Sequence, residues 1–235
     1  MPELNTFVDY VLYTKYWEYG LAFGFMAMFL LFYIFLRTPS SREVPAAATE
    51  AVPAADRIQG FMVPEGFYFH QGHTWAKPLS DDEALIGIDD FAQRLAGPLK
   101  GVELPEVGQS LHQGDKAWSL NAASKAIDML SPMDGQVVEV NTELAKSPDE
   151  LEADPYGKGW LIKVKAPDIK ARLKNLFSGK LAKTWTQQSV DDLTAMAAHG
   201  ELGASMADGG EPIHGIAKAI DDDNWDMICR EFFMT

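Results

Sequence analysis

Few side chains in this sequence have types and neighbours that suit chemistry. His70 and His73 are three residues apart in a strand-rich segment, where positions i and i+3 face opposite ways. Because no further ligand is close by in the sequence, we expect no metal site there. The single cysteine, Cys229, has only Arg230 beside it to lower its pKa, so we expect no nucleophilic role. Lys125 is the remaining candidate, and the elements around it decide what its amine can do.

Composition limits the classes of partner. The 235-residue chain has a formal net charge of −14, and no basic face is visible in the sequence. Binding to phosphates needs such a face, so we expect no nucleic-acid partner. A hydrophobic fraction of 47% is ordinary for a globular protein and is sufficient for a buried core. One cysteine excludes an internal disulfide.

The N-terminal segment, residues 1–37, has the pattern of a membrane anchor. No charged residue occurs from 19 to 36, and Arg37 follows directly. A helix of that length spans roughly 27 Å, about the thickness of a bilayer core. The sequence therefore predicts a transmembrane helix over 19–36. Gly20 and Gly24 form a small-xxx-small pair, which predicts close packing against another helix.

Basic residues around this span predict its orientation. Lys15 precedes the span, whereas Arg37 and Arg42 follow it. Positive charge favours the cytoplasmic side of a membrane. We therefore expect a single-pass protein of the inner (cytoplasmic) membrane, with its soluble part on the cytoplasmic side.

The remainder divides into a linker and a mainly β domain. Residues 38–57 are rich in Pro, Ala and Ser without apolar periodicity, which is typical of an extended tether. Short apolar runs separated by turn residues then predict a compact β-sandwich over 58–197. Two short helices are expected within it, one at 90–96 after Asp89 and one beginning at Pro148. A mainly helical segment is expected over 168–197, with Leu173, Leu176, Phe177 and Leu181 on its apolar face.

Five motifs of the β domain occur in one order and spacing. They are HTW at 73–75, GIDDFAQ at 87–93, ELPEVG at 103–108, SPMDGQVVEVN at 131–141 and DPYGKGWLIKVK at 154–165. Together they resemble the H-protein of the glycine cleavage system. The resemblance implies a lipoyl-type fold, a barrel-sandwich hybrid of two small antiparallel sheets. It also implies a hairpin lysine that carries lipoate, and no enzymatic activity of its own.

The hairpin departs from the family pattern. Counting from Gly108 or back from Pro132 places Ser124 at the carrier position, and Lys125 follows one residue late. Because one step along a strand turns a side chain to the opposite face, the shift matters for attachment. Lys125 can be a displaced lipoyl carrier, an ordinary exposed lysine, or part of a hairpin reused for docking. We expect no cofactor, with lipoate on Lys125 as the alternative.

The C-terminal extension, residues 198–235, begins with a Gly-rich stretch and ends with an amphipathic aromatic helix. Trp225, Ile228 and Phe232 lie on one helical face, and Phe233 adds to it. Such a face must be covered. The helix either folds back on its own domain or inserts into a partner groove, and we expect these four residues to bind a partner.

Two functions fit these features. The favoured hypothesis is a non-catalytic, membrane-anchored subunit or docking module of a membrane complex, with electron transfer as the favoured setting and the carrier function lost. The alternative is a membrane-tethered lipoyl carrier, modified on Lys125, that hands a dithiol or aminomethyl-type adduct to a membrane-associated enzyme. The expected partners are the lipid bilayer and other subunits of the complex.

Overall fold

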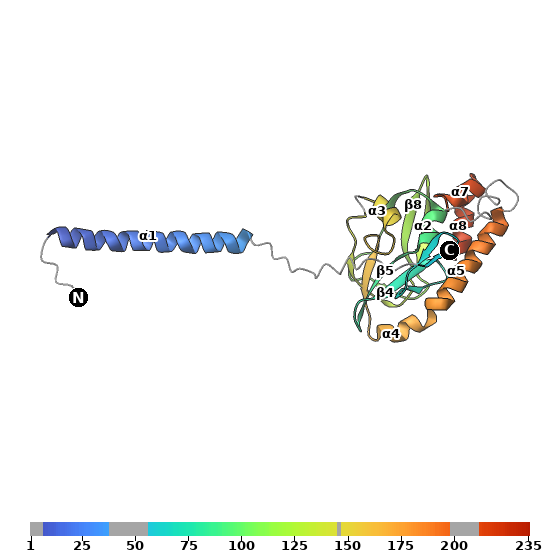
Figure 1. Ribbon diagram of the computed structural model, residues 1–235, viewed down its shortest axis with the longest axis horizontal. Coiled ribbons are helices and arrows are strands. Elements are labelled where there is room, and N and C mark those ends of the chain that lie inside the picture. The colour runs from blue at the N-terminus through green and yellow to red at the C-terminus, as the bar shows by residue number, and fades with distance from the viewer. Residues whose placement is uncertain (1–6, 38–55, 145–146, 198–211) are drawn as a thin grey trace. The chain divides into compact units, whose positions relative to one another are not determined.

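The computed structural model describes residues 7–37, 56–144, 147–197 and 212–235. The chain divides into two compact units, Met1–Thr49 and Glu50–Thr235. Figure 1 labels elements of each unit.

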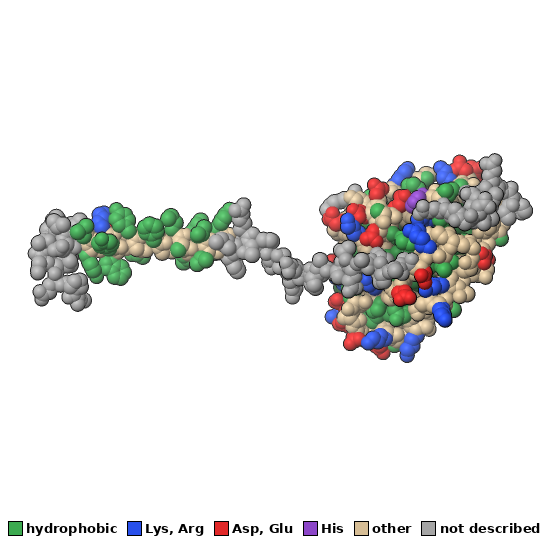
Figure 2. Space-filling view, viewed as in Figure 1, with side chains coloured by type: hydrophobic (Ala, Val, Ile, Leu, Met, Phe, Trp, Pro, Cys, Tyr) green, Lys and Arg blue, Asp and Glu red, His purple; other side chains and the backbone are tan. Residues whose placement is uncertain are grey.

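The first unit is built around one long helix, α1 (Phe7–Arg37), so the expected helix at 19–36 forms and begins earlier. Its apolar side chains are exposed, for example Leu21, Phe25 and Leu31, each about two-thirds exposed. Figure 2 shows these hydrophobic side chains along the helix. Within the described residues, however, no helix combines the length and apolar character of a membrane span. The described residues therefore do not support the predicted transmembrane helix.

The second unit contains three antiparallel sheets. The small sheet pairs β1 (Asp56–Ile58) with β2 (Phe61–Val63). The six-stranded sheet has the order β3 (Tyr68–Phe69), β4 (Thr74–Pro78), β5 (Glu83–Ile88), β11 (Ile162–Lys165), β10 (Gly135–Val140), β7 (Ser110–Leu111). The three-stranded sheet has the order β6 (Leu99–Glu103), β8 (Lys116–Ala122), β9 (Lys125–Leu130). The expected linker at 38–57 is two residues too long, because β1 already includes Asp56 and Arg57; residues 38–55 lie outside the described part.

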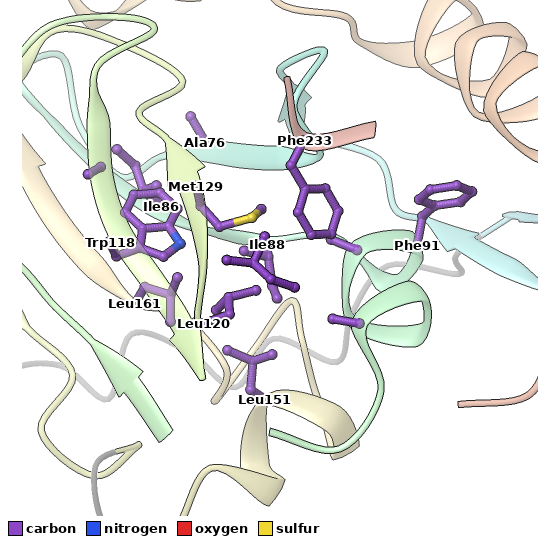
Figure 3. Packing of buried hydrophobic residues seen from close by; sticks show 14 of the residues in the cluster. Ala76, Ile86, Ile88, Phe91, Trp118, Leu120, Met129, Leu151, Leu161 and Phe233 are labelled. Atoms are coloured by element: carbon purple, nitrogen blue, oxygen red, sulfur yellow. The ribbon is translucent and has the colours of Figure 1, made fainter. Parts of the chain in front are cut away.

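A shared apolar core joins the two larger sheets. Ile86 and Ile88 of β5 pack in one cluster with Leu120 of β8 and Met129 of β9, and all four are fully buried. Figure 3 shows these side chains meeting between the strands. The arrangement confirms the mainly β sandwich expected from the sequence.

Helix α2 (Asp90–Ala96) closes one end of this core. The Asp89 side chain accepts a hydrogen bond from the Ala92 amide at 2.7 Å, and Gly97 ends the helix, both as expected. Helix α3 (Asp149–Ala153) starts one residue later than predicted. Pro148 takes the N-cap position and no side chain caps the helix, so the expected capping box does not form.

The segment after β11 is less continuous than expected. It contains α4 (Ile169–Arg172), a 3-10 turn (Leu173–Asn175) and α5 (Gly179–Ala197). Phe177 interrupts the helix because its backbone pairs with Phe69, through two N–H···O bonds of 2.8 Å. Leu181 is 58% exposed and does not join the predicted apolar face.

The C-terminal segment folds onto this same unit as α7 (Ile216–Ile220) and α8 (Trp225–Phe233). Both helices contact α2, and α8 also lies along β9. Figure 1 shows the C-terminus beside α2 and α8. The second half of the expected extension is therefore part of the domain, while residues 198–211 lie outside the described part.

Candidate functional site at the lysine hairpin

The β8–β9 hairpin has a two-residue turn. Ala122 pairs with Lys125, so Ala123 and Ser124 form the turn itself. Ala123 has a φ of 49°, in the left-handed region that tight hairpin turns require at this position. Ser124 is exposed at the tip, and Lys125 is the first residue of β9. The serine therefore occupies the turn and the lysine belongs to a strand.

Strand alternation fixes the direction of the lysine. Lys125 shares a face of β9 with Ile127 and Met129, which are both fully buried. Its side chain consequently starts toward the domain rather than away from it. At 35% exposure it emerges at the edge of the core, beneath α8.

Three groups of the C-terminal segment hold the Lys125 ammonium. Its Nζ donates a hydrogen bond to the carbonyl oxygen of Asp223 at 2.8 Å. It also forms an ion pair with the Asp226 carboxylate and lies 5.7 Å from the centre of the Trp225 ring. The hydrogen bond from Lys125, with its charge, lowers the pKa of Asp226. The lysine amine thus fastens the C-terminal segment, residues 212–235, to the hairpin. This segment is called the tail below.

The tail approaches the domain surface closely at three glycines. A Cβ on Gly97 would lie 2.7 Å from the Cα of Gly215, and one on Gly72 would lie 2.8 Å from the Phe233 carbonyl oxygen. A Cβ on Gly60 would overlap the ring of Pro212. Such distances are below ordinary contact, so the close approach depends on glycine at these positions.

Polar contacts complete the docking of the tail on α2. The Gly215 amide donates to the Arg94 carbonyl oxygen at 2.8 Å, and Arg94 Nη1 donates to the carbonyl of Pro212. Gln93 Nε2 lies 3.1 Å from His214 Nδ1. At the other end, Arg230 Nη2 donates to the Ala126 carbonyl oxygen of β9 at 3.3 Å. The tail is therefore held along its described length.

The aromatic tail residues enter the core of their own domain. Phe233 and Trp225 are 0% and 4% exposed, while Ile228 and Phe232 are partly buried against the same cluster. Figure 3 shows the Phe233 ring pointing into the core near Ile88. This corrects the expectation that the tail offers these side chains to a partner groove: burial within the domain satisfies their need for cover.

The two histidines have structural partners. His73 Nδ1 lies 2.8 Å from Asp89 Oδ2, and its ring stacks on Phe91 at 4.1 Å between centroids. His70 Nδ1 accepts a hydrogen bond from the Gly72 amide at 3.0 Å, and burial lowers the pKa of His70. Within the described residues, no cluster of three or more potential metal-ligating side chains occurs.

Cys229 lies on the inner side of α8 and is fully buried. Burial raises its pKa to about 12, so the thiol stays protonated at neutral pH. A thiol in that state is a poor nucleophile. Its position makes it a reporter of tail docking, because it becomes accessible only when α8 leaves the domain.

Sequence reasoning identified Lys125 and Ser124 but missed Asp226, which is 101 positions further along the chain. No local pattern signals that contact. The structure brings Trp225 to Lys125 and leaves Gly20 and Gly24 in the separate first unit. These two glycines line a groove on α1, together with four larger residues: Trp17, Leu21, Phe25 and Met28.

Comparisons with known proteins show which family the β domain matches. A family model described as Glycine cleavage H-protein matches residues 67–189. A probable glycine cleavage system H protein of Pyrococcus horikoshii is 38% identical over 120 residues, which cover 51% of this chain and 89% of that protein. The glycine cleavage system H protein of Coprothermobacter proteolyticus is 41% identical over 105 residues, covering 45% and 83%. A crystal structure of a glycine cleavage system H protein from Mycobacterium marinum is 29% identical, with a TM-score of 0.47, and covers 54% of this chain and 98% of that one.

Proposed function

Because the chain belongs to the glycine cleavage H-protein family, we propose that it is a membrane-attached, non-catalytic subunit of a larger assembly, in which the carrier function has been lost. Members of this family are carriers rather than enzymes, and they hold lipoate on a lysine. A redox assembly is the proposed setting. The proposed partners are the bilayer and other subunits, with no nucleic acid.

The engagement of Lys125 carries the proposal. A carrier arm must swing free, whereas this amine is bound by Asp226, by the Asp223 carbonyl and by the Trp225 ring. Ser124 occupies the exposed turn position. Lipoate on Nζ does not fit this arrangement, because an amide nitrogen is neutral and keeps a single N–H donor.

The alternative is a tethered lipoyl carrier modified on Lys125. One observation favours it: the lysine is at the carrier hairpin and its side chain is 35% exposed. Under this alternative the tail would have to leave the hairpin for Lys125 to be modified and to move.

The intact mass of protein purified from its native membrane tests the loss of the carrier function. We expect an unmodified Lys125, since the amine is engaged and out of position. A matched double variant, Ser124→Lys with Lys125→Ala, places the lysine in the exposed turn, and we expect a lipoate ligase to modify it in vitro. One lipoyl group mapped to Lys125 of the native protein would establish the alternative.

The proposed attachment to a membrane is supported by α1. Its segment 19–36 contains no charged residue, and the large apolar side chains described within it, such as Leu21, Phe25 and Leu31, are exposed. Exposed apolar surface of this extent is costly in water and favours a bilayer or another apolar helix. Gly20 and Gly24 would allow such a helix to approach closely. Arg37 and Arg42, against Lys15, support a cytoplasmic location of the β domain at the inner membrane.

Flotation with lipid vesicles tests this attachment. We expect the full chain to float and residues 50–235 alone to remain at the bottom of the gradient. Phe25→Lys should weaken flotation strongly, because a charge inside an apolar segment costs about 2.5–3.5 kcal/mol at the bilayer centre. Leu12→Lys adds the same charge before the charge-free segment and should have a smaller effect.

Washing the vesicles with alkaline carbonate then separates integral from peripheral attachment. Equal recovery of the full chain and residues 50–235 in the floating fraction would refute a bilayer role for α1.

A further inference from the structure

We propose that the C-terminal helix α8 is an intramolecular cap on Lys125, such that docking of the tail and acylation of the lysine amine exclude one another. The inference rests on the proposed function, since it gives the physical reason why Lys125 is not used as a carrier. If Lys125 is instead a lipoyl carrier, the same cap regulates its modification.

Two of the three contacts that build the cap, the ion pair and the cation–ring contact, need a charged lysine. The ammonium donates to the Asp223 carbonyl and pairs with Asp226, whose other oxygen lies 3.8 Å from Arg230 Nε. It also lies over the face of Trp225, where a cation is attracted by the ring. Asp226 therefore binds two cations at once, one on the hairpin and one on its own helix.

Acylation removes the ion pair with Asp226 and the cation–ring contact with Trp225, and it leaves a single N–H donor. The ammonium first releases a proton, and the freed nitrogen lone pair attacks the carbonyl carbon of an activated acyl donor. The new N–C bond forms as the bond to the donor's leaving group breaks, and the leaving group departs with the electron pair and takes up the second proton that the nitrogen loses. The product is a neutral amide with one N–H, which can neither neutralise Asp226 nor act as a cation over Trp225.

Docking of the tail in turn opposes acylation of Lys125. The nitrogen lone pair becomes available only when the proton and its partners are given up, and the tail covers the approach to the amine. The two states are thus linked: docking of the tail disfavours acylation of Lys125, and acylation disfavours docking of the tail by the same free energy.

Chemical acylation of the purified full chain measures how docking of the tail affects the reactivity of Lys125. The probe is N-hydroxysuccinimidyl acetate, with modified lysines resolved by peptide mass spectrometry. We expect Lys125 to react about tenfold more slowly than the exposed Lys100 of β6, given that charge-assisted hydrogen bonds must be broken. Asp226→Asn should remove most of that protection.

Asp222→Asn is the matched control. Asp222 pairs with Lys218 four residues earlier, 3.3 Å away, and is exposed on the same segment. The same change of charge there should leave the Lys125 rate unchanged.

The accessibility of Cys229 measures how the loss of charge on Lys125 affects docking of the tail. Lys125→Gln imitates the neutral amide, and we expect it to raise the rate of Cys229 labelling by a thiol reagent about tenfold, because α8 loses its ion pair. Lys125→Arg keeps a cation at the hairpin and should raise the rate less.

Two results would overturn the cap. One is equal acylation of Lys125 and Lys100 in the unaltered chain, and the other is a Cys229 rate that does not respond to Lys125→Gln. Either outcome leaves the loss of carrier function open to the native-mass measurement, because that experiment reads modification in the cell and not reactivity of the purified chain. Lipoate found on native Lys125 would conversely refute the proposed loss while leaving the linkage intact.

Discussion

Replacing Phe233 by alanine should lower the free energy of unfolding of the β domain by about 3–5 kcal/mol. The side chain is fully buried and belongs to the same cluster as Ile88 and Met129. Its removal takes apolar surface out of the core and leaves a cavity that neighbouring strands can fill only in part. Urea unfolding followed by tryptophan fluorescence measures the effect.

Met227→Ala is the matched control for this variant. Met227 is on the same helix but 65% exposed, and a substitution there should change the unfolding free energy by no more than about 0.5 kcal/mol. Removal of residues 224–235 should destabilise the domain at least as much as Phe233→Ala. If truncation instead strips a co-purifying subunit while the domain remains stable, α8 is a partner anchor and not part of the core.

Asp89→Ala should cost about 2–4 kcal/mol of unfolding free energy. One carboxylate oxygen caps α2 through the Ala92 amide at 2.7 Å, and the other lies 2.8 Å from His73 Nδ1. Alanine removes the cap and leaves a buried imidazole nitrogen without its partner. Thermal unfolding of the purified chain, read by circular dichroism, tests this loss.

Asp89→Asn separates the two contributions. Asparagine keeps an oxygen that can accept from Ala92, so the helix cap survives while the contact with His73 changes. We expect about half the loss seen with alanine. Equal losses for both variants would mean that the cap contributes little, and no loss for either would contradict the structural role of the pair.

Elements with strong local signals were predictable from the sequence. Helix α2 formed at the expected residues because Asp89 is a good N-cap and Gly97-Pro98 ends the pattern. Counting between turn motifs predicted that Ser124 takes the carrier position, and the hairpin register places Ser124 in the turn. Family membership was also recognisable, since five motifs keep their order.

Features that depend on distant segments were not predictable in the same way. Phe177 has a helical neighbourhood, yet its backbone pairs with Phe69 across more than a hundred positions. The contact between Lys125 and Asp226 likewise joins residues 101 positions apart. The amphipathic pattern of α8 showed that it must be covered, but periodicity cannot say by which surface.

The burial of Phe233 has a consequence for the order in which this protein matures. A chain is synthesised from its N-terminus, so α1 and the Lys125 hairpin are made before α8, whose residues complete the core. The nascent β domain therefore passes through a stage in which Lys125 is uncapped and the site for Phe233 is empty. Any enzyme or chaperone that acts on the hairpin has its best opportunity during that interval, which ends when α8 docks.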